Sequence, residues 1–191
     1  YGTIEGSPED EIRRQFDVNV FGLGRVAQAV MPIMRRQGSG RIINIASVVG
    51  KLALPFAGWY SASKHAVEAI SDALRLEAAP FGIRVSVIEP GAIKTEFDET
   101  ALDKLDASPD PEAYADAKAG FRSAIVDAYR KAPGPERVAK AVVHAATARR
   151  PRRRYAVPAD AKALMIARRF LSDGMFDRIL VRVLRLRNRD R

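Results

Sequence analysis

Tyr60 and Lys64 stand four residues apart in the stretch G-W-Y-S-A-S-K-H-A, and together they could act as an acid tuned by a cation. On a helix, side chains at positions i and i+4 share one face about 6 Å apart, so the Lys64 ammonium reaches the neighbourhood of the Tyr60 phenol. The ordinary pKa of a phenol is about 10, and lowering it to neutrality requires about 4 kcal/mol, which a cation in a partly desolvated site supplies. The same spacing is common on ordinary surface helices, so the pair alone leaves both interpretations open.

The elements around this pair place it at the edge of a predicted parallel sheet. Continuous apolar runs at 41–46 and 83–88 predict two strands that are covered on both faces. The segment 60–80 between them has helical periodicity, and a strand, a helix and a strand in that order form a right-handed parallel crossover. Ser47 follows the first strand, at the edge where open α/β sheets bind ligands. We therefore expect Ser47 to converge with the phenol and the amine on one crevice.

A long helix is expected to precede the first strand, over residues 8–37. Ser7 is a suitable cap, and Pro8 suits the first helical position. Asn19 lies on the apolar stripe of this helix, where a buried amide needs hydrogen-bond partners. Both a structural amide satisfied by its neighbours and a functional amide fit this position.

The composition indicates one globular domain and excludes several kinds of site. The chain has 191 residues, of which 47% are hydrophobic and 29% are charged. It has no cysteine and only two histidines, so thiolate zinc sites and cysteine nucleophiles are excluded and we expect no metal. No apolar run reaches the ~18 residues of a membrane span and no signal-peptide pattern is present, so the expected location is cytoplasmic.

The basic character of the chain is confined to its tail. Residues 149–191 carry fourteen Lys and Arg against four Asp and Glu, a net charge of +10, whereas residues 1–148 carry eighteen against nineteen, a net charge of −1. The arginines at 149–154 lack interleaved aromatic residues. Nucleic-acid binding is therefore a minor alternative, and we expect no nucleic-acid partner.

Four motifs occur in a fixed order along the chain: N-V-F-G around Asn19, I-N-I-A-S ending at Ser47, Y-S-A-S-K from Tyr60 to Lys64, and P-G-A-I-K-T at 90–95. Their order and the thirteen-residue step from Ser47 to Tyr60 resemble the short-chain dehydrogenase/reductase family. The resemblance covers roughly the first 160 residues. It implies an α/β fold with a Rossmann-like, doubly wound parallel sheet. It also implies hydride transfer between NAD or NADP and an alcohol or ketone substrate.

The resemblance further implies a role for each matching residue. Tyr60 is the general acid/base and Ser47 hydrogen-bonds the substrate oxygen, while Lys64 lowers the Tyr60 pKa and holds the nicotinamide ribose. Asn19 positions a proton-relay water. The implied cofactor-binding residues are Tyr60, Lys64, Pro90, Gly91, Ile93 and Thr95. Carbonyl reduction places charge on oxygen, so a phenol and a hydroxyl beside it suit the reaction.

One family feature has no counterpart, namely the glycine-rich turn that cradles the cofactor pyrophosphate. Gly22 and Gly24 lie inside a predicted helix, and Gly38 and Gly40 precede a strand, so neither pair follows a strand as the turn requires. We therefore expect this sequence to be the carboxyl-terminal part of a longer enzyme and to lack the first four strands of the sheet. The isolated chain is expected not to turn over substrate. A non-catalytic scaffold with the same fold is the alternative.

The resemblance divides the chain into residues 1–157, a partial catalytic region, and residues 158–191, a basic amphipathic helical tail. Within the first part, 97–131 corresponds to the lid that covers the substrate. Ordinary packing is the alternative for each of the aromatic and aliphatic candidates for substrate contact. These candidates are Phe97, Leu102, Tyr114 and Phe121 in the lid, with Phe56 and Trp59 just before the Tyr60 helix.

The segment 151–157 and the tail after it are loosely similar to family members that act on steroids, retinoids and other long apolar alcohols. Family members also usually form homo-oligomers, through the helices at 8–37 and 60–80. In the tail, an apolar stripe is flanked by arginines; it consists of Phe176, Ile179, Leu180, Val183 and Leu184. Two interpretations fit this stripe: peripheral contact of residues 174–191 with an anionic membrane, or packing over the mouth of the substrate site.

Overall fold

The computed structural model describes residues 1–186, apart from the side chains of 159–161, and contains one three-stranded parallel sheet. The strands β1 (Gly40–Ile45), β2 (Ile83–Pro90) and β3 (Arg154–Val157) lie in the order β1-β2-β3. The α-helices of the described residues are α1 (Glu9–Phe16), α2 (Leu23–Gln37), α3 (Gly58–Ala78), α4 (Glu96–Ala107), α5 (Ala115–Lys131), α6 (Glu136–Thr147), α7 (Ala159–Phe170) and α8 (Asp173–Val183). The predicted α/β class and the two predicted apolar strands are confirmed.

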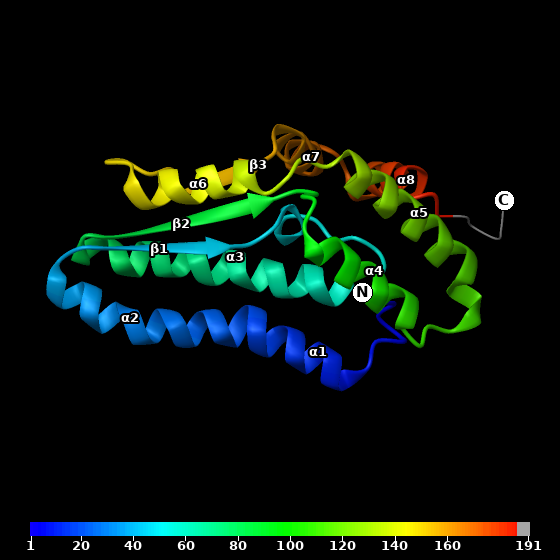
Figure 1. Cartoon of the computed structure of the whole chain (residues 1–191), viewed down its shortest axis with the longest axis horizontal. Coiled ribbons are helices and arrows are strands. Elements are labelled where there is room, and N and C mark those ends of the chain that lie inside the picture. The colour runs from blue at the N-terminus through cyan, green and yellow to red at the C-terminus, as the bar shows by residue number, and fades with distance from the viewer. Residues whose placement is uncertain (187–191) are drawn as a thin grey trace.

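Helices cover both faces of the sheet, as the doubly wound arrangement requires (Figure 1). On one face, Val85 of β2 packs with Ala27 of α2 and Leu74 of α3. On the other face, Ile88 of β2 packs against Ala141 of α6. Because successive side chains of a strand point to opposite faces, an unbroken apolar run such as that of β2 supplies both cores.

The helical region expected at 8–37 is interrupted by a π-helical turn. The turn spans Asp17–Gly22 and contains Asn19, with α1 before it and α2 after it. π-helical turns are rare and are frequent at functional sites. The region ends at Gly38, whose φ of 65° lies in the left-handed region that glycine adopts without strain.

The helix α3 carries the tyrosine and the lysine and begins two residues earlier than expected, at Gly58. A single turn of 3₁₀ helix at Val48–Gly50 follows β1, so the chain passes from the carboxyl end of that strand towards the amino terminus of α3. Buried serines on α3 have hydrogen-bond partners. Ser71, for example, accepts a 2.8 Å bond from the Asn44 amide of β1 and donates to the carbonyl of Val67.

The expected lid region forms α4 and α5, which lie beyond the carboxyl ends of the strands (Figure 1). The two helices share a buried cluster in which Leu105 and Phe121 pack with Phe56 and with Leu184 from the end of the chain. Phe121 is therefore a core residue rather than a substrate contact, and ordinary packing is the correct interpretation for it. This cluster also attaches the tail to the lid.

The tail forms α7 and α8, which lie beside β3 and α5 in Figure 1. Residues 187–191, the end of the segment 174–191 expected to contact either a membrane or the site, lie outside the described residues. None of the helices that the structure describes combines the length and the apolar character that crossing a bilayer requires. The expected division of the chain at residue 157 and the expected cytoplasmic location stay predictions.

At the opposite side of the sheet, β1 pairs with β2 alone among the described residues. A groove of about 400 Å³ runs along this edge of β1 and is lined mainly by apolar side chains of β1 and α2, including Val26 and Ile43. One edge of β1 is thus unpaired among the described residues, which fits the expectation that further strands of the sheet are missing from this sequence.

Candidate active site

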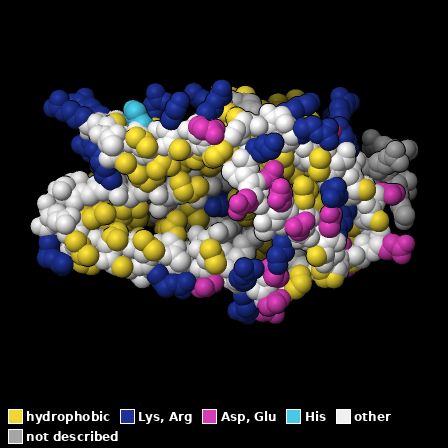
Figure 2. Space-filling view, viewed as in Figure 1, with side chains coloured by type: hydrophobic (Ala, Val, Ile, Leu, Met, Phe, Trp, Pro, Cys, Tyr) yellow, Lys and Arg dark blue, Asp and Glu magenta, His cyan; other side chains and the backbone are white. Residues whose placement is uncertain are grey.

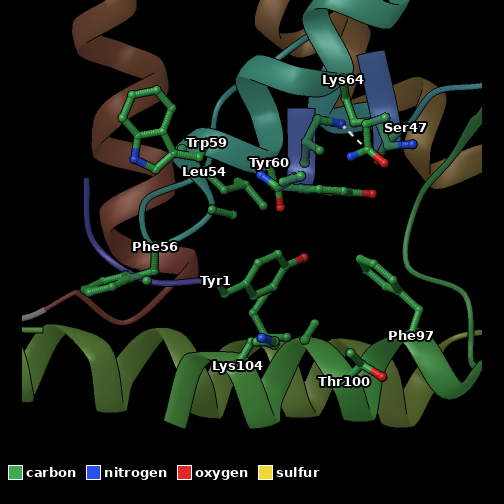
Figure 3. Close-up of a pocket in the computed structure, with 18 of the residues that line it drawn as sticks. Tyr1, Ser47, Leu54, Phe56, Trp59, Tyr60, Lys64, Phe97, Thr100 and Lys104 are labelled. Atoms are coloured by element: carbon green, nitrogen blue, oxygen red, sulfur yellow. Dashed lines mark hydrogen bonds between the residues drawn. The ribbon is translucent and has the colours of Figure 1, made fainter. Parts of the chain in front are cut away.

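A cavity of about 870 Å³ opens at the carboxyl ends of the strands, and every predicted site residue lines it (Figure 3). The predicted residues on its wall are Asn19, Ser47, Tyr60, Lys64, Pro90, Gly91, Ile93 and Thr95. Its volume lies within the range of ordinary small-molecule sites. The convergence that the crossover topology predicts is therefore present.

Tyr60 occupies the first turn of α3, and its ring is enclosed by other aromatic rings. The ring centres of Tyr1 and Phe97 lie 5.9 and 5.6 Å from that of Tyr60, and the three rings surround one open space in Figure 3. Burial raises the pKa of Tyr60 to about 12, although the hydroxyl of Ser47 acts in the opposite direction. The expected lowering of the Tyr60 pKa is not found in this structure, because desolvation of the phenolate dominates. The phenol is protonated at neutral pH.

Lys64 lies one helical turn after Tyr60, as the i, i+4 spacing predicts. Its Nζ is 5.7 Å from the centre of the Tyr60 ring and donates a 3.0 Å hydrogen bond to the carbonyl of Ile45 at the end of β1. Burial lowers the pKa of Lys64 because the ammonium is partly removed from water. The lysine therefore joins α3 to β1 and presents a cationic group to the cavity wall.

Ser47 lies two residues after the end of β1, in extended backbone geometry. Its hydroxyl donates to the carbonyl of Pro90 and accepts from the amide of Val49, each at 3.3 Å. Both distances exceed the usual range for hydrogen bonds that involve a hydroxyl, so neither partner holds the group strongly. The hydroxyl can reorient towards an oxygen atom in the cavity.

Asn19 is connected to α3 by a partner that the sequence did not suggest. Its Nδ2 donates a 3.0 Å bond to Ser63 Oγ, and Ser63 in turn donates to the backbone carbonyl of Tyr60. Ser63 is fully buried. The π-helical turn thus presents the Asn19 amide to the helix that carries Tyr60 and Lys64, and Ser63 satisfies the Nδ2 group of this amide.

The segment after β2 carries the residues that the resemblance assigns to the cofactor. The amide of Gly91 donates to the carbonyl of Val157 in β3 at 2.8 Å, which fixes the loop to the sheet. Thr95 is the cap of α4: its side chain accepts from the amide of Phe97, and Asp98 bonds back to the Thr95 amide. The spacing T-E-F-D could have shown this cap in the sequence.

These residues fit the nicotinamide and ribose end of a dinucleotide cofactor. Lys64 supplies a cation to the cavity, and the loop from Pro90 to Thr95 supplies backbone at the same edge. Within residues 1–186, no glycine pair follows a strand to form a pyrophosphate cradle, since Gly22 and Gly24 lie in helical turns, as expected.

The aromatic wall of the cavity differs in part from the expected lid. Phe56, Trp59 and Phe97 line the cavity, whereas Leu102, Tyr114 and Phe121 do not. The Tyr114 hydroxyl instead donates to a Glu5 carboxylate oxygen on the surface. Sequence reasoning missed further wall residues; these are Tyr1, Leu54, Ile125 and Tyr129. Burial raises the pKa of Tyr1, and its phenol hydrogen-bonds that of Tyr129.

A buried ionic cluster lies behind the site and was also missed. The guanidinium of Arg154 in β3 contacts Glu68 and Asp72 of α3 and Glu89 of β2. Lys51, from the segment after Ser47, contacts Glu68 at 2.8 Å. The cluster therefore joins the segments that carry Ser47, Tyr60 and Pro90. The sequence did contain a signal for this cluster, because Glu89 is an acidic residue at the end of the apolar run V-I-E.

A protein-family model described as short chain dehydrogenase matches residues 2–106. The chain belongs to this family. It is 34% identical over 191 residues to a Helicobacter pylori protein named probable short-chain type dehydrogenase/reductase VdlC, covering all of this chain and 69% of the relative. It is 36% identical over 186 residues to human retinol dehydrogenase 5, covering 92% of this chain and 58% of the relative.

Solved structures of family members have the same fold. A short-chain dehydrogenase from Streptomyces avermitilis superimposes with a TM-score of 0.72 at 30% identity, covering 96% of this chain and 63% of that one. A short-chain dehydrogenase/reductase from Burkholderia phymatum, solved in complex with NAD, gives 0.70 at 25% identity, covering 88% and 60%. The Rossmann-like fold is confirmed. The chain spans about three fifths to two thirds of the length of these relatives.

Proposed function

We propose that the site takes part in hydride transfer between NAD or NADP and an alcohol or ketone. The observation that carries this proposal is the placement of Ser47, Tyr60 and Lys64 on one cavity at the carboxyl ends of parallel strands. The cofactor supplies a hydride donor or acceptor when bound. The residues of this chain supply the proton, the hydrogen bonds to the reacting oxygen and the enclosure.

Tyr60 delivers the proton in the reductive direction. Its phenol is protonated at physiological pH and lines the cavity, so it can donate to an oxygen that gains charge during the reaction. The Ser47 hydroxyl stabilises the same oxygen with a second hydrogen bond. In the oxidative direction Tyr60 must lose its proton, and the adjacent Lys64 ammonium stabilises the phenolate.

We assign Lys64 to cofactor binding and Asn19 to proton supply in this transfer. We assign Lys64 to the ribose hydroxyls of the cofactor, because its ammonium faces the cavity at the end of β1. Asn19 donates to Ser63 through Nδ2, which leaves its carbonyl oxygen to hold a water on the path by which Tyr60 is reprotonated.

The substrate class that the wall favours is an apolar alcohol or ketone. Aromatic and aliphatic side chains surround the reacting groups, notably Leu54, Trp59 and Phe97. The retinol dehydrogenase among the relatives supports a substrate of the steroid, retinoid or long-chain type for this chain as well. We also propose that the chain forms a homo-oligomer through α2 and α3, where Val26 and Leu76 are exposed.

Assay of the complete gene product with NADH and NADPH on a long-chain ketone tests the proposal. We expect turnover that falls about a hundredfold in Ser47→Ala, because one donor to the developing oxyanion is lost. Ser123→Ala, on the outer part of α5, is the matched control and should keep the parent rate. Full activity of Ser47→Ala, or no conversion of any apolar alcohol or ketone with either cofactor, contradicts the proposal.

A second measurement addresses the cofactor end alone. The 191-residue chain should bind nicotinamide mononucleotide, which lacks the adenylate half, weakly and through Lys64. Saturation-transfer NMR on the chain and on Lys64→Met measures this binding. Binding that Lys64→Met does not weaken contradicts the assignment of the ribose site.

A further inference from the structure

The tail helix α8 carries two apolar lines, not the single stripe that the sequence indicates. Phe176, Leu180 and Leu184 face the protein and pack into its core clusters. Ile179 and Val183 instead lie in the solvent, with 42% and 60% of their surfaces exposed. The inner side of α8 thus packs on the protein, and the outer side leaves apolar side chains open to a partner.

The outer line is longer than these two residues. Met175, Ile179 and Val183 follow one another at intervals of four, so they form a continuous row along one side of α8. Phe170, at the end of α7, is 79% exposed just before this row begins. A run of large exposed apolar side chains on a helix indicates a surface that another apolar phase covers.

Basic side chains accompany this row. Arg178 and Arg182 stand on the outside of α8, and no ion pair joins either of them to another side chain that the structure describes. Two other arginines of the tail are paired: Arg168 with Asp173, and Arg185 with Asp127, each at 2.8 Å. Figure 2 shows Lys and Arg along the edge of the molecule that carries α6 to α8, whereas acidic side chains gather over α4 and α5. Within α8 itself Asp173 and Asp177 balance the two arginines, and Asp173 is paired with Arg168, so the positive excess of the tail comes from the segments next to this helix.

We propose that the outer side of α8, together with Phe170, docks on the surface of an anionic lipid bilayer. The helix lies in the plane of the interface, its apolar row enters the boundary between headgroups and acyl chains, and Arg178 and Arg182 contact anionic headgroups. The net charge of +10 in residues 149–191, against −1 in the rest of the chain, favours a negative surface over a neutral one.

Docking in this orientation has a consequence for the cavity. The inner side of α8 packs behind the cavity wall, because Leu184 shares a buried cluster with Phe56, which lines the cavity. Docking would therefore hold the wall of the cavity that Phe56 forms close to the bound face of the molecule. The docking itself does not depend on the proposed reaction, because no residue of α7 or α8 lines the cavity.

Flotation of the 191-residue chain with vesicles in a density gradient tests the proposal and separates bound protein from aggregates, which sink. The vesicles contain phosphatidylcholine alone or with one third phosphatidylserine. We expect flotation with the anionic vesicles, little with the neutral ones, and a decrease at high salt. Arg178→Gln with Arg182→Gln should lower the partition coefficient about 25-fold, since each basic residue contributes about fivefold. Ile179→Ser with Val183→Ser should lower it about tenfold.

Two double variants serve as matched controls. Arg13→Gln with Arg14→Gln removes the same charge from α1, and Ile4→Ser with Val143→Ser removes an exposed isoleucine and valine from the segment before α1 and from α6. Both should float within about twofold of the parent chain. Equal flotation with neutral and anionic vesicles, or equal losses in control and α8 variants, overturns the proposal. A change of oligomeric state in the α8 variants without a change in flotation also overturns it, in favour of a second copy as the occupant.

Discussion

Arg154→Met should destabilise the fold, because it removes the cation shared by a buried carboxylate cluster. Nη1 of Arg154 lies 2.8 Å from Glu89 Oε1, and Nη2 lies 2.6 Å from Asp72 Oδ2. The side chains of Glu68 and Glu89 are only 5% and 3% exposed. In the variant, Lys51 remains with Glu68, but Glu89 loses the one ion-pair partner that it has among the described side chains.

The loss of stability in Arg154→Met depends on how many cationic partners each carboxylate of the cluster keeps. Removing one member of a buried ion pair costs about 3–5 kcal/mol, because a charge stays behind without compensation. Lys51 still compensates Glu68, and Asp72 is 44% exposed, so the lower end applies: about 3 kcal/mol at neutral pH. For a protein of this size, that loss corresponds to a decrease of about 6–12 °C in Tm.

The loss should depend on pH with a defined sign. Burial and the charge of Glu68 raise the pKa of Glu89 above its ordinary value of 4.5, and removal of the Arg154 guanidinium raises this pKa further. The folded variant then binds a proton more tightly than the unfolded chain does, so its stability is retained at low pH and falls as the pH rises through the folded pKa. The difference between Arg154→Met and the parent should therefore shrink as the pH falls towards the ordinary value.

Urea unfolding followed by circular dichroism, at about pH 7 and about pH 5, measures these differences. Glu89→Gln combined with Arg154→Met should be more stable than Arg154→Met alone, since the unpaired charge is removed with its partner. Arg122→Met is the matched control, because Arg122 forms a bidentate pair with Asp106 that solvent screens, so its removal should change stability much less. A loss in Arg154→Met no larger than in Arg122→Met, or one independent of pH, would refute the reasoning.

Two further substitutions test the packing around the cavity. Thr95→Ala should lower the free energy of unfolding in urea by about 1 kcal/mol, because it removes the cap of α4. Thr100→Ala, on the exposed side of the same helix, should lower it less. Equal losses in the two variants would contradict the cap. Phe121→Ala should lower the free energy of unfolding by about 3–5 kcal/mol, because the ring is fully buried. Phe170→Ala removes an exposed ring and should change this free energy by less than about 0.5 kcal/mol. Similar effects of the two substitutions would contradict the assignment of Phe121 to the core.

The parts of the site that the sequence predicts depend on strand and helix order. Uninterrupted apolar runs at 41–46 and 83–88 identify buried parallel strands, and parallel strands end at one edge of the sheet. Residues that follow such strands must therefore meet, as Ser47 and Pro90 do at 3.3 Å. The spacing of Tyr60 and Lys64 adds the helix to the same edge.

Other features depend on tertiary contacts that local spacing does not encode. The pKa of Tyr60 is raised because rings from distant segments, such as Tyr1 and Phe97, remove its phenol from water, and no pattern near residue 60 reports their arrival. The π-helical turn at Asn19 holds an extra residue, and beyond it Ala27 is buried whereas Val26 is 64% exposed, a change of helix face that the apolar spacing does not report. The roles of Phe121 and of the outer row of α8 likewise depend on which neighbours the fold brings to them.

The central claim is that Tyr60 exchanges a proton with the oxygen of a substrate held in this cavity. Steady-state reduction of an apolar ketone by the complete gene product, compared with Tyr60→Phe and Tyr114→Phe, tests it most directly. The account predicts that Tyr60→Phe lowers kcat by about 10²–10⁴, since the phenyl ring keeps the packing but has no proton to give, while Tyr114→Phe, whose hydroxyl bonds Glu5 on the surface, keeps the parent rate. Parent-like turnover by Tyr60→Phe would contradict the claim.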